Sequence, residues 1–198
     1  IETISGCMTH PAIRAMFHRV QADEITQTVA PVPGMMPLTY LELIEQRFSN
    51  PRIADTTRRV AFDASARHAG FVLPILRDQL AAGRSVAGLA LVEAFWARMC
   101  AGTREDGSEI VPNDPIWDAL RPVAEAARTR PAAWLEQARP YGDLAQAEDF
   151  SAAFSDWLSL IWAEGAVAAM NTYTSADNQD GRVQPDRPQR SRSTHTGT

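Results

Sequence analysis

Apolar side chains recur along this chain at the spacing of α-helices. In residues 11–29 they fall at i, i+3, i+4 and i+7, which places them on one helix face: Ile13, Met16, Phe17 and Val20. The apolar stretch over residues 150–162 shows the same amphipathic spacing with several aromatic side chains. Because no alternating strand pattern of useful length interrupts these stretches, the sequence predicts an all-α fold.

Proline and capping residues indicate where the predicted helices begin. Asn50-Pro51 and Asp114-Pro115 each place an N-cap residue before a proline at the first helical position. Thr39 and Glu42 have the spacing of a capping box. Helices are therefore predicted over residues 11–29, 39–48, 51–63, 71–82, 86–101 and 131–139, with another starting near 115 and a last one containing 150–162.

The most apolar of these segments runs from Val86 to Ala101. It is apolar on nearly every side, so we expect it to be the central buried helix. The Asp106-Gly107 pair in the turn region that follows is typical of a short hairpin. Pro122 lies inside the next helical pattern, which it is expected to kink or split.

The character of the chain changes at residue 175. Residues 175–198 contain almost no apolar side chains and are rich in Pro, Arg, Ser, Thr and Asp. Such a segment cannot bury enough surface to offset the entropy of ordering it. The sequence thus predicts a helical domain over residues 1–174 and a disordered tail over residues 175–198.

Composition and charge exclude several kinds of protein. The formal net charge of −5 disfavours nucleic acid as a partner, which requires a clustered basic face. No apolar run is long enough for a transmembrane helix, and no secretory signal opens the chain, so we expect a cytoplasmic protein without membrane contact. Cys7 and Cys100 stand far apart without metal or redox spacing and are interpreted as reduced thiols.

Motifs that would carry chemistry by themselves are few. No GxGxxG sequence follows a strand, so no dinucleotide-binding turn is predicted in these residues. His10 and His18 lie eight residues apart, but no third ligand accompanies them, and no metal site is predicted. The 198 residues include no lysine, which excludes chemistry by a lysine amine of this chain.

One polar stretch stands between two apolar predicted helices. From Asp63 to Gly70 it combines a carboxylate, a hydroxyl, a guanidinium and an imidazole. Arg67 and His68 can each donate a hydrogen bond to a hydroxyl or carbonyl oxygen, as a polyhydroxylated ligand in a mostly apolar cleft requires. The alternative is a local ion pair between Asp63 and Arg67, which are four residues apart.

Five segments, in this order, resemble the C-terminal domain of the mannitol dehydrogenase family, the polyol-specific long-chain dehydrogenases. They are DEITQTVAPVPG (23–34), RFSNPRIADTTRRVAFDASARH (47–68), FVLPILRDQLAAG (71–83), VPNDPIWDAL (111–120) and YGDLA (141–145). The resemblance covers residues 1–173. It implies a multi-helix C-terminal domain like that of two-domain dehydrogenases of the 6-phosphogluconate dehydrogenase type.

The resemblance further implies a mannitol-type polyol dehydrogenase. An N-terminal Rossmann domain binds NAD or NADP, and a hydride moves between the nicotinamide and a polyol such as mannitol, which is interconverted with a ketose such as fructose. The general base is a lysine on a helix that also carries asparagine and histidine, and no metal is used. We expect these catalytic residues before Ile1, and therefore expect the 198-residue chain alone to be inactive.

Within this chain the resemblance implies a substrate role for Arg67. Arg67 matches a basic residue that faces the substrate hydroxyls, and His68 beside it is the second predicted substrate-binding residue. Relatives have Gly at Ala64 and Pro-Lys at Ala69-Gly70, so the preferred polyol is left open. The other hypothesis is a non-catalytic helical interaction module derived from the same family, whose apolar face a partner protein would cover.

Overall fold

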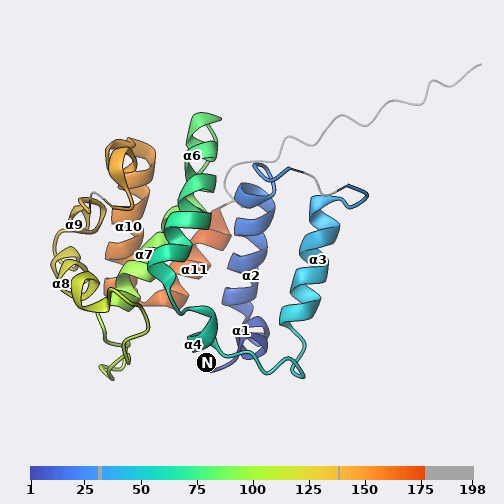
Figure 1. The fold of residues 1–198 in the computed structure, drawn as a ribbon, viewed down its shortest axis with the longest axis horizontal. Helices are drawn as coiled ribbons and strands as arrows, with labels where there is room; N and C mark the ends of the chain where they lie inside the picture. The colour runs from blue at the N-terminus through green and yellow to red at the C-terminus, as the bar shows by residue number, and fades with distance from the viewer. Residues whose placement is uncertain (31–32, 138, 177–198) are drawn as a thin grey trace, which may run out of the picture.

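The computed structural model describes residues 1–30, 33–137 and 139–176, and their regular structure is helical apart from two isolated β-bridges (Figure 1). The predicted all-α fold is confirmed. The α-helices are α1 (Ile4–Thr9), α2 (Pro11–Val20), α3 (Pro37–Phe48), α4 (Thr57–Val60), α5 (Ala64–Arg67), α6 (Leu73–Ala81), α7 (Ala87–Cys100), α8 (Trp117–Ala127), α9 (Ala132–Leu135), α10 (Glu148–Glu164) and α11 (Ala166–Ser175). Two π-helical turns, η1 (Gln21–Ile25) and η2 (His68–Val72), and a 3₁₀ turn, η3 (Gly142–Gln146), complete them.

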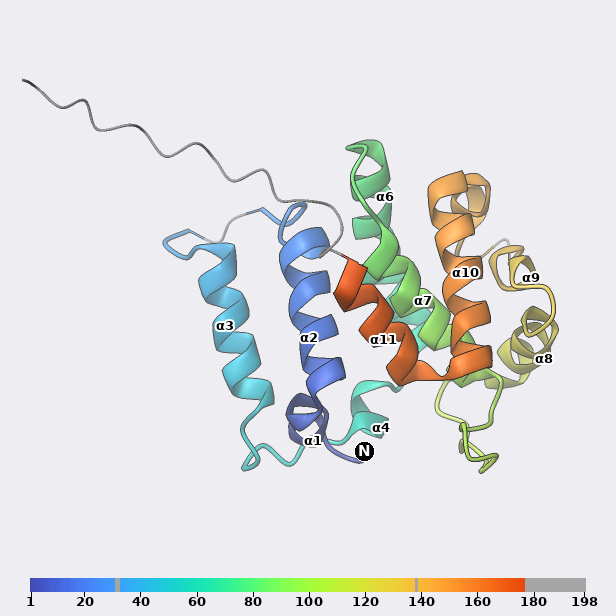
Figure 2. The same cartoon turned by 180° about the vertical axis from the view of Figure 1, so that it is seen from behind.

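Helix α7 is the centre of the core, as its apolar sequence predicts. Its residues Leu89, Ala90, Leu91 and Ala94 are fully or almost fully buried. Helix α10 packs along it, with α11, α2 and α8 around them. Both views place α3 at one end of the molecule and α8 with α9 at the other (Figures 1 and 2).

The first predicted helices differ from the structure at their ends. The helix from Pro11 changes to the π-helical turn η1 after Val20. Helix α3 begins at Pro37, with Met36 as its N-cap residue, so the predicted capping box from Thr39 is wrong. Pro37 takes the first helical position, where the missing N–H costs nothing.

The predicted helix over residues 51–63 is also wrong, since only the four residues of α4 are helical there. Asn50 caps a turn instead, its side-chain oxygen accepting the N–H of Arg52 at 3.0 Å. The residues before α4 lie extended against the start of the chain: Ile4 N–H donates to the carbonyl of Asp55 (3.0 Å), and Thr3 and Thr56 form an antiparallel bridge. These long-range contacts override the local helical pattern.

The polar stretch predicted as a helix junction is itself helical. After Asp63, which has a left-handed φ of 57°, α5, η2 and α6 follow one another without interruption. The predicted hairpin is confirmed by an antiparallel bridge between Thr103 and Glu109. Helix α8 runs through Pro122 without being split.

The C-terminal helices differ from the sequence pattern in one respect. The last predicted helix ends at Gly165, whose φ is 93°, and α11 follows as a separate helix that the pattern did not indicate. Residues 177–198 of the predicted tail lie outside the described residues, so the division at residue 174 stays a prediction. None of the described helices is long and apolar enough to cross a membrane.

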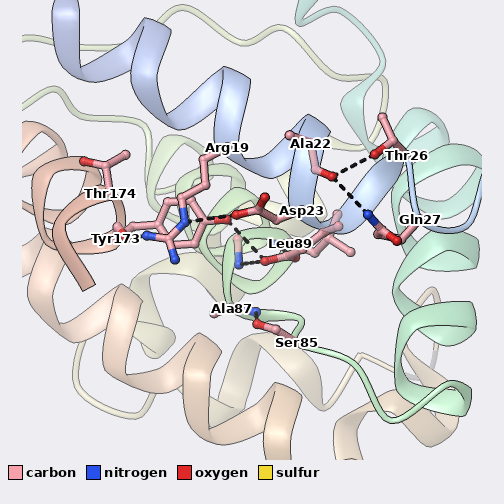
Figure 3. A network of polar contacts seen from close by, with 12 residues as sticks. Arg19, Ala22, Asp23, Thr26, Gln27, Ser85, Ala87, Leu89, Tyr173 and Thr174 are labelled. Atoms are coloured by element: carbon pink, nitrogen blue, oxygen red, sulfur yellow. Dashed lines mark hydrogen bonds and ion pairs between the residues drawn. The ribbon is translucent and has the colours of Figure 1, made fainter. Parts of the chain in front are cut away.

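The buried carboxylate of Glu24 connects the start of α7 with Tyr173 in α11. Glu24 in η1 accepts the backbone N–H groups of Gly88 (2.6 Å) and Leu89 (2.8 Å), and so caps the N-terminus of α7. The hydroxyl of Tyr173 donates to the same carboxylate at 3.3 Å. The guanidinium of Arg19 lies 4.5 Å from the centre of the Tyr173 ring and donates to its carbonyl oxygen (Figure 3). Helices α2, α7 and α11 are thereby connected.

This cap predicts an unusual pH dependence. Burial raises the pKa of Glu24, although the N–H groups of Leu89 and Gly88 oppose the shift. Because the folded state then binds the proton more tightly than the unfolded state, stability from this group is full below the ordinary value and is lost as the pH rises through the raised value. The advantage of the wild type over Glu24→Gln in unfolding free energy should therefore narrow from about pH 4 to about pH 7.

Urea unfolding of both proteins at several pH values measures this advantage. Glu42→Gln, which removes an exposed carboxylate from α3, is the reference for the loss of one charge. A wild-type advantage that grows between about pH 4 and about pH 7 would contradict the raised pKa of Glu24.

Candidate functional site

Asp114 fixes the segment that carries Arg67 and His68 through hydrogen bonds to Ser65. One carboxylate oxygen of Asp114 accepts the N–H of Ser65 (2.7 Å) and the other accepts its hydroxyl (2.8 Å). The N–H of Asp63 donates to the carbonyl of Asn113 at 3.3 Å. The sequence blocks around Asp114 and around Arg67, separate in the chain, therefore form one structural unit, and Asp114 caps α5 from another part of the chain.

Arg67 lies at the surface at the end of α5. Its Nε donates to the carbonyl of Phe62 at 3.0 Å, and within the described residues it forms no ion pair with Asp63. The Phe62 carbonyl holds the guanidinium by one edge, so the two terminal nitrogens remain for an external acceptor. The local ion-pair alternative is not what the structure shows.

The side chain of His68 contacts the interior of the domain. Its Nδ1 lies 2.6 Å from Oε1 of Glu93 on α7, and its ring stacks on Trp96 with 4.4 Å between ring centres and 25° between planes. The His68 side chain is 15% exposed, whereas the Glu93 side chain is fully buried. Arg67 and His68 are neighbours in sequence, but Arg67 is exposed whereas His68 is mostly buried.

Glu93 belongs to a buried chain of hydrogen bonds. The hydroxyl of Tyr141 donates to Oε2 of Glu93 at 2.6 Å, and Nε1 of Trp134 donates to that hydroxyl at 2.6 Å. Burial, reinforced by the Glu93 carboxylate, raises the pKa of Tyr141 well above its usual value, so the phenol stays neutral. Sequence reasoning missed Glu93. The available signal was that Glu93 is the one carboxylate in a helix whose only other charged residue is Arg98, and a buried carboxylate needs partners.

Exposed apolar side chains surround this unit. They lie on α4, on the loops before α5 and α8, and in η2: Val60, Phe62, Phe71, Val111 and Ile116. Phe71, which lies four residues after Arg67, is 70% exposed. Ile1, at the start of the chain, is also exposed, and Thr57 near it donates to its carbonyl. Exposed apolar surface of this kind is typical of a contact with another domain or protein.

Arg67 and His68 do not line the cavity that lies near the N-terminal helices. That cavity has a volume of about 900 Å³ and lies between α2, α3 and the end of α11, with Arg14, His18 and Glu45 in its wall. A smaller cavity of about 390 Å³ opens between α4 and the loop before α8, lined among others by Arg58, Val111 and Asn113. Arg67 thus lies on an open face. Within the described residues, no cluster of His, Cys, Asp and Glu could hold a metal ion.

Comparison with known sequences gives a consistent result. A family model described as the mannitol dehydrogenase C-terminal domain matches residues 1–162. A mannitol 2-dehydrogenase of Cereibacter sphaeroides is 46% identical over 176 residues, which are 89% of this chain and 37% of that protein. One from Pyricularia oryzae is 27% identical over 169 residues, or 85% of this chain and 34% of the relative. The chain thus spans little more than a third of the length of these relatives.

Two solved structures have the same fold. A Pseudomonas fluorescens mannitol 2-dehydrogenase, in a ternary complex with NAD and D-mannitol, matches with a TM-score of 0.83 and 25% identity over 88% of this chain and 36% of that one. A D-sorbitol dehydrogenase in substrate-free form matches with a TM-score of 0.78 and 20% identity, and covers 86% of this chain and 35% of its own. The second match shows the likeness of the fold alone.

Proposed function

Since the chain belongs to the mannitol dehydrogenase family, in which it corresponds to the C-terminal domain, we propose that it forms the substrate side of an NAD(P)-dependent polyol dehydrogenase. The observation that carries the proposal is the exposed guanidinium of Arg67, held by the Phe62 carbonyl among exposed apolar side chains. A charged donor on a largely apolar face suits a ligand with several hydroxyl groups. The substrate would be mannitol or a similar polyol, with a ketose as the product.

We assign substrate binding to residues of this chain and nucleotide binding to another domain. Arg67 donates hydrogen bonds from its terminal nitrogens to substrate hydroxyl oxygens, and His68, the next residue in the sequence, is the second proposed substrate contact. The cofactor accepts the hydride when it is bound. The described residues include no parallel sheet with a glycine-rich turn, so we assign the nucleotide mainly to a Rossmann domain packed against the apolar side chains around Arg67. We also propose a cytoplasmic location and a role in polyol metabolism.

A chimera tests the proposal. This chain would replace the matching 37% of the Cereibacter sphaeroides mannitol 2-dehydrogenase, to which it is 46% identical. The chimera should reduce NAD when D-mannitol is added, because the relative supplies the nucleotide site and this chain the substrate face. The isolated 198-residue chain should show no such activity, since it lacks lysine and a dinucleotide-binding turn.

Two results would contradict the proposal. One is turnover by the isolated chain, which would place the whole reaction within these residues. The other is a folded chimera that binds NAD and oxidises none of mannitol, sorbitol and arabinitol. That second result would favour the alternative of a non-catalytic interaction module.

A further inference from the structure

A donor-only indole sets the direction of the hydrogen bonds that lead to His68. Nε1 of Trp134 can only donate, and its partner is the hydroxyl oxygen of Tyr141 at 2.6 Å. The single hydrogen of that hydroxyl is then directed to Oε2 of Glu93, also at 2.6 Å. Residue 93 must therefore accept a hydrogen bond on the Tyr141 side.

The other oxygen of Glu93 faces His68. Oε1 lies 2.6 Å from Nδ1, and because a carboxylate can only accept, a carboxylate at residue 93 requires the hydrogen in this contact to be on Nδ1. The stacking of the His68 ring on Trp96 holds the ring in this orientation. Nε2 of the same ring is not fully buried and forms no hydrogen bond within the described residues.

We propose that Glu93 is a positioning residue that holds His68, the residue after Arg67, in the Nδ1–H tautomer, so that Nε2 of the ring is available as a hydrogen-bond acceptor. The proposal rests on the proposed function for the identity of the ligand. Tyr141 acts through Glu93, because it occupies the oxygen that does not face His68.

This arrangement names the substrate chemistry more closely. Arg67 can only donate, and Nε2 of His68 can only accept, so together they match hydroxyl groups, which do both. A carbonyl oxygen lacks the hydrogen that Nε2 requires. Arg67 and His68 therefore suit secondary hydroxyls of the polyol away from the reacting carbon, and these hydroxyls persist in the ketose.

The substitution Glu93→Gln tests the tautomer, because it should invert it. The introduced amide must turn its carbonyl oxygen to the Tyr141 hydroxyl, which leaves its NH₂ group to donate to Nδ1. The hydrogen of the neutral His68 ring then moves to Nε2, which becomes a donor. Long-range ¹H–¹⁵N correlation spectra of the histidine-labelled chain at about pH 9 distinguish the two tautomers.

Tyr141→Phe is the matched control. It removes the hydroxyl but leaves the carboxylate facing His68, so the Nδ1–H tautomer should persist. A wild-type ring with hydrogen on Nε2, whether alone or together with Nδ1, overturns the inference. So does a folded Glu93→Gln protein that keeps the Nδ1–H tautomer. Should Glu93→Gln fail to fold by circular dichroism, the wild-type spectrum and that of Tyr141→Phe decide the question.

A kinetic measurement separates this inference from the proposed function. In the chimera described above, Glu93→Gln should raise KM for D-mannitol about tenfold and change kcat much less, the effect of one lost substrate hydrogen bond. An inactive chimera with the Nδ1–H tautomer intact would refute the function and leave the positioning by Glu93 standing. An active chimera whose KM is unchanged by Glu93→Gln would refute the role of Nε2 as a substrate contact.

Discussion

Replacement of Gly88 by alanine is expected to destabilise the protein by about 3 kcal/mol or more. A Cβ atom at this position would lie 2.8 Å from Oε1 of Glu24 and would overlap the hydroxyl of Tyr173. Both groups are buried and belong to the cap of α7, so the added methyl group must displace the carboxylate from the N–H groups of Gly88 and Leu89. Buried donors without partners then add to the cost of steric strain.

Urea unfolding followed by circular dichroism measures this effect. Gly70→Ala is the matched control, because nothing lies within 4 Å of a Cβ atom there and Gly70 is part of the helical turn η2. Alanine favours helix over glycine by up to about 1 kcal/mol, so this control should be neutral or more stable. Similar losses for the two variants would show that the close approach at Gly88 is not what matters.

Arg67→Ala is expected to lower kcat/KM for D-mannitol about 100-fold in the chimera with the Cereibacter sphaeroides relative. The loss corresponds to about 3 kcal/mol, the upper end of what a charged hydrogen bond to a substrate contributes. Because Arg67 is exposed and its one hydrogen bond within the described residues is from Nε to the Phe62 carbonyl, the melting temperature should change little. Arg67→Lys should restore part of the activity, since it keeps the charge but not the planar fork.

The control for this substitution is Arg130→Ala. Arg130 is exposed and pairs with Glu136 near α9, at the end of the molecule where α8 and α9 lie. Its removal also deletes one positive charge, so it corrects for any general electrostatic effect on substrate binding. Steady-state rates over a range of D-mannitol concentrations measure both variants. Equal rates for Arg67→Ala and Arg130→Ala would show that Arg67 does not contact the substrate.

Local patterns predicted the parts of the fold that depend on nearby residues. The apolar run of α7 indicated the buried centre of the fold. Where distant segments interact, the patterns were insufficient. Residues 55–57 pair with the start of the chain, and this pairing replaces most of the helix predicted over residues 51–63.

The sequence likewise indicated the residues of the candidate site that are close in the chain, but not the distant residues that contact them. The cluster of polar residues and the family resemblance indicated Arg67 and His68 from sequence alone. The residues that position them, Asp114 and Glu93, lie 49 and 25 positions from Ser65 and His68, respectively, and no periodicity connects them. Only the packing of α5 and η2 against α7 and the loop before α8 brings these carboxylates into contact with the site.

The most direct test of the whole account is the crystal structure of the chimera with NAD and D-mannitol bound. The account predicts a hydroxyl oxygen of the polyol within about 3.2 Å of a terminal nitrogen of Arg67, and a second hydroxyl at similar distance from Nε2 of His68. It also predicts that Phe62 and Phe71 become buried against the nucleotide-binding domain. A polyol bound in the cavity between α2 and α3, or with every oxygen more than about 5 Å from Arg67, would contradict it.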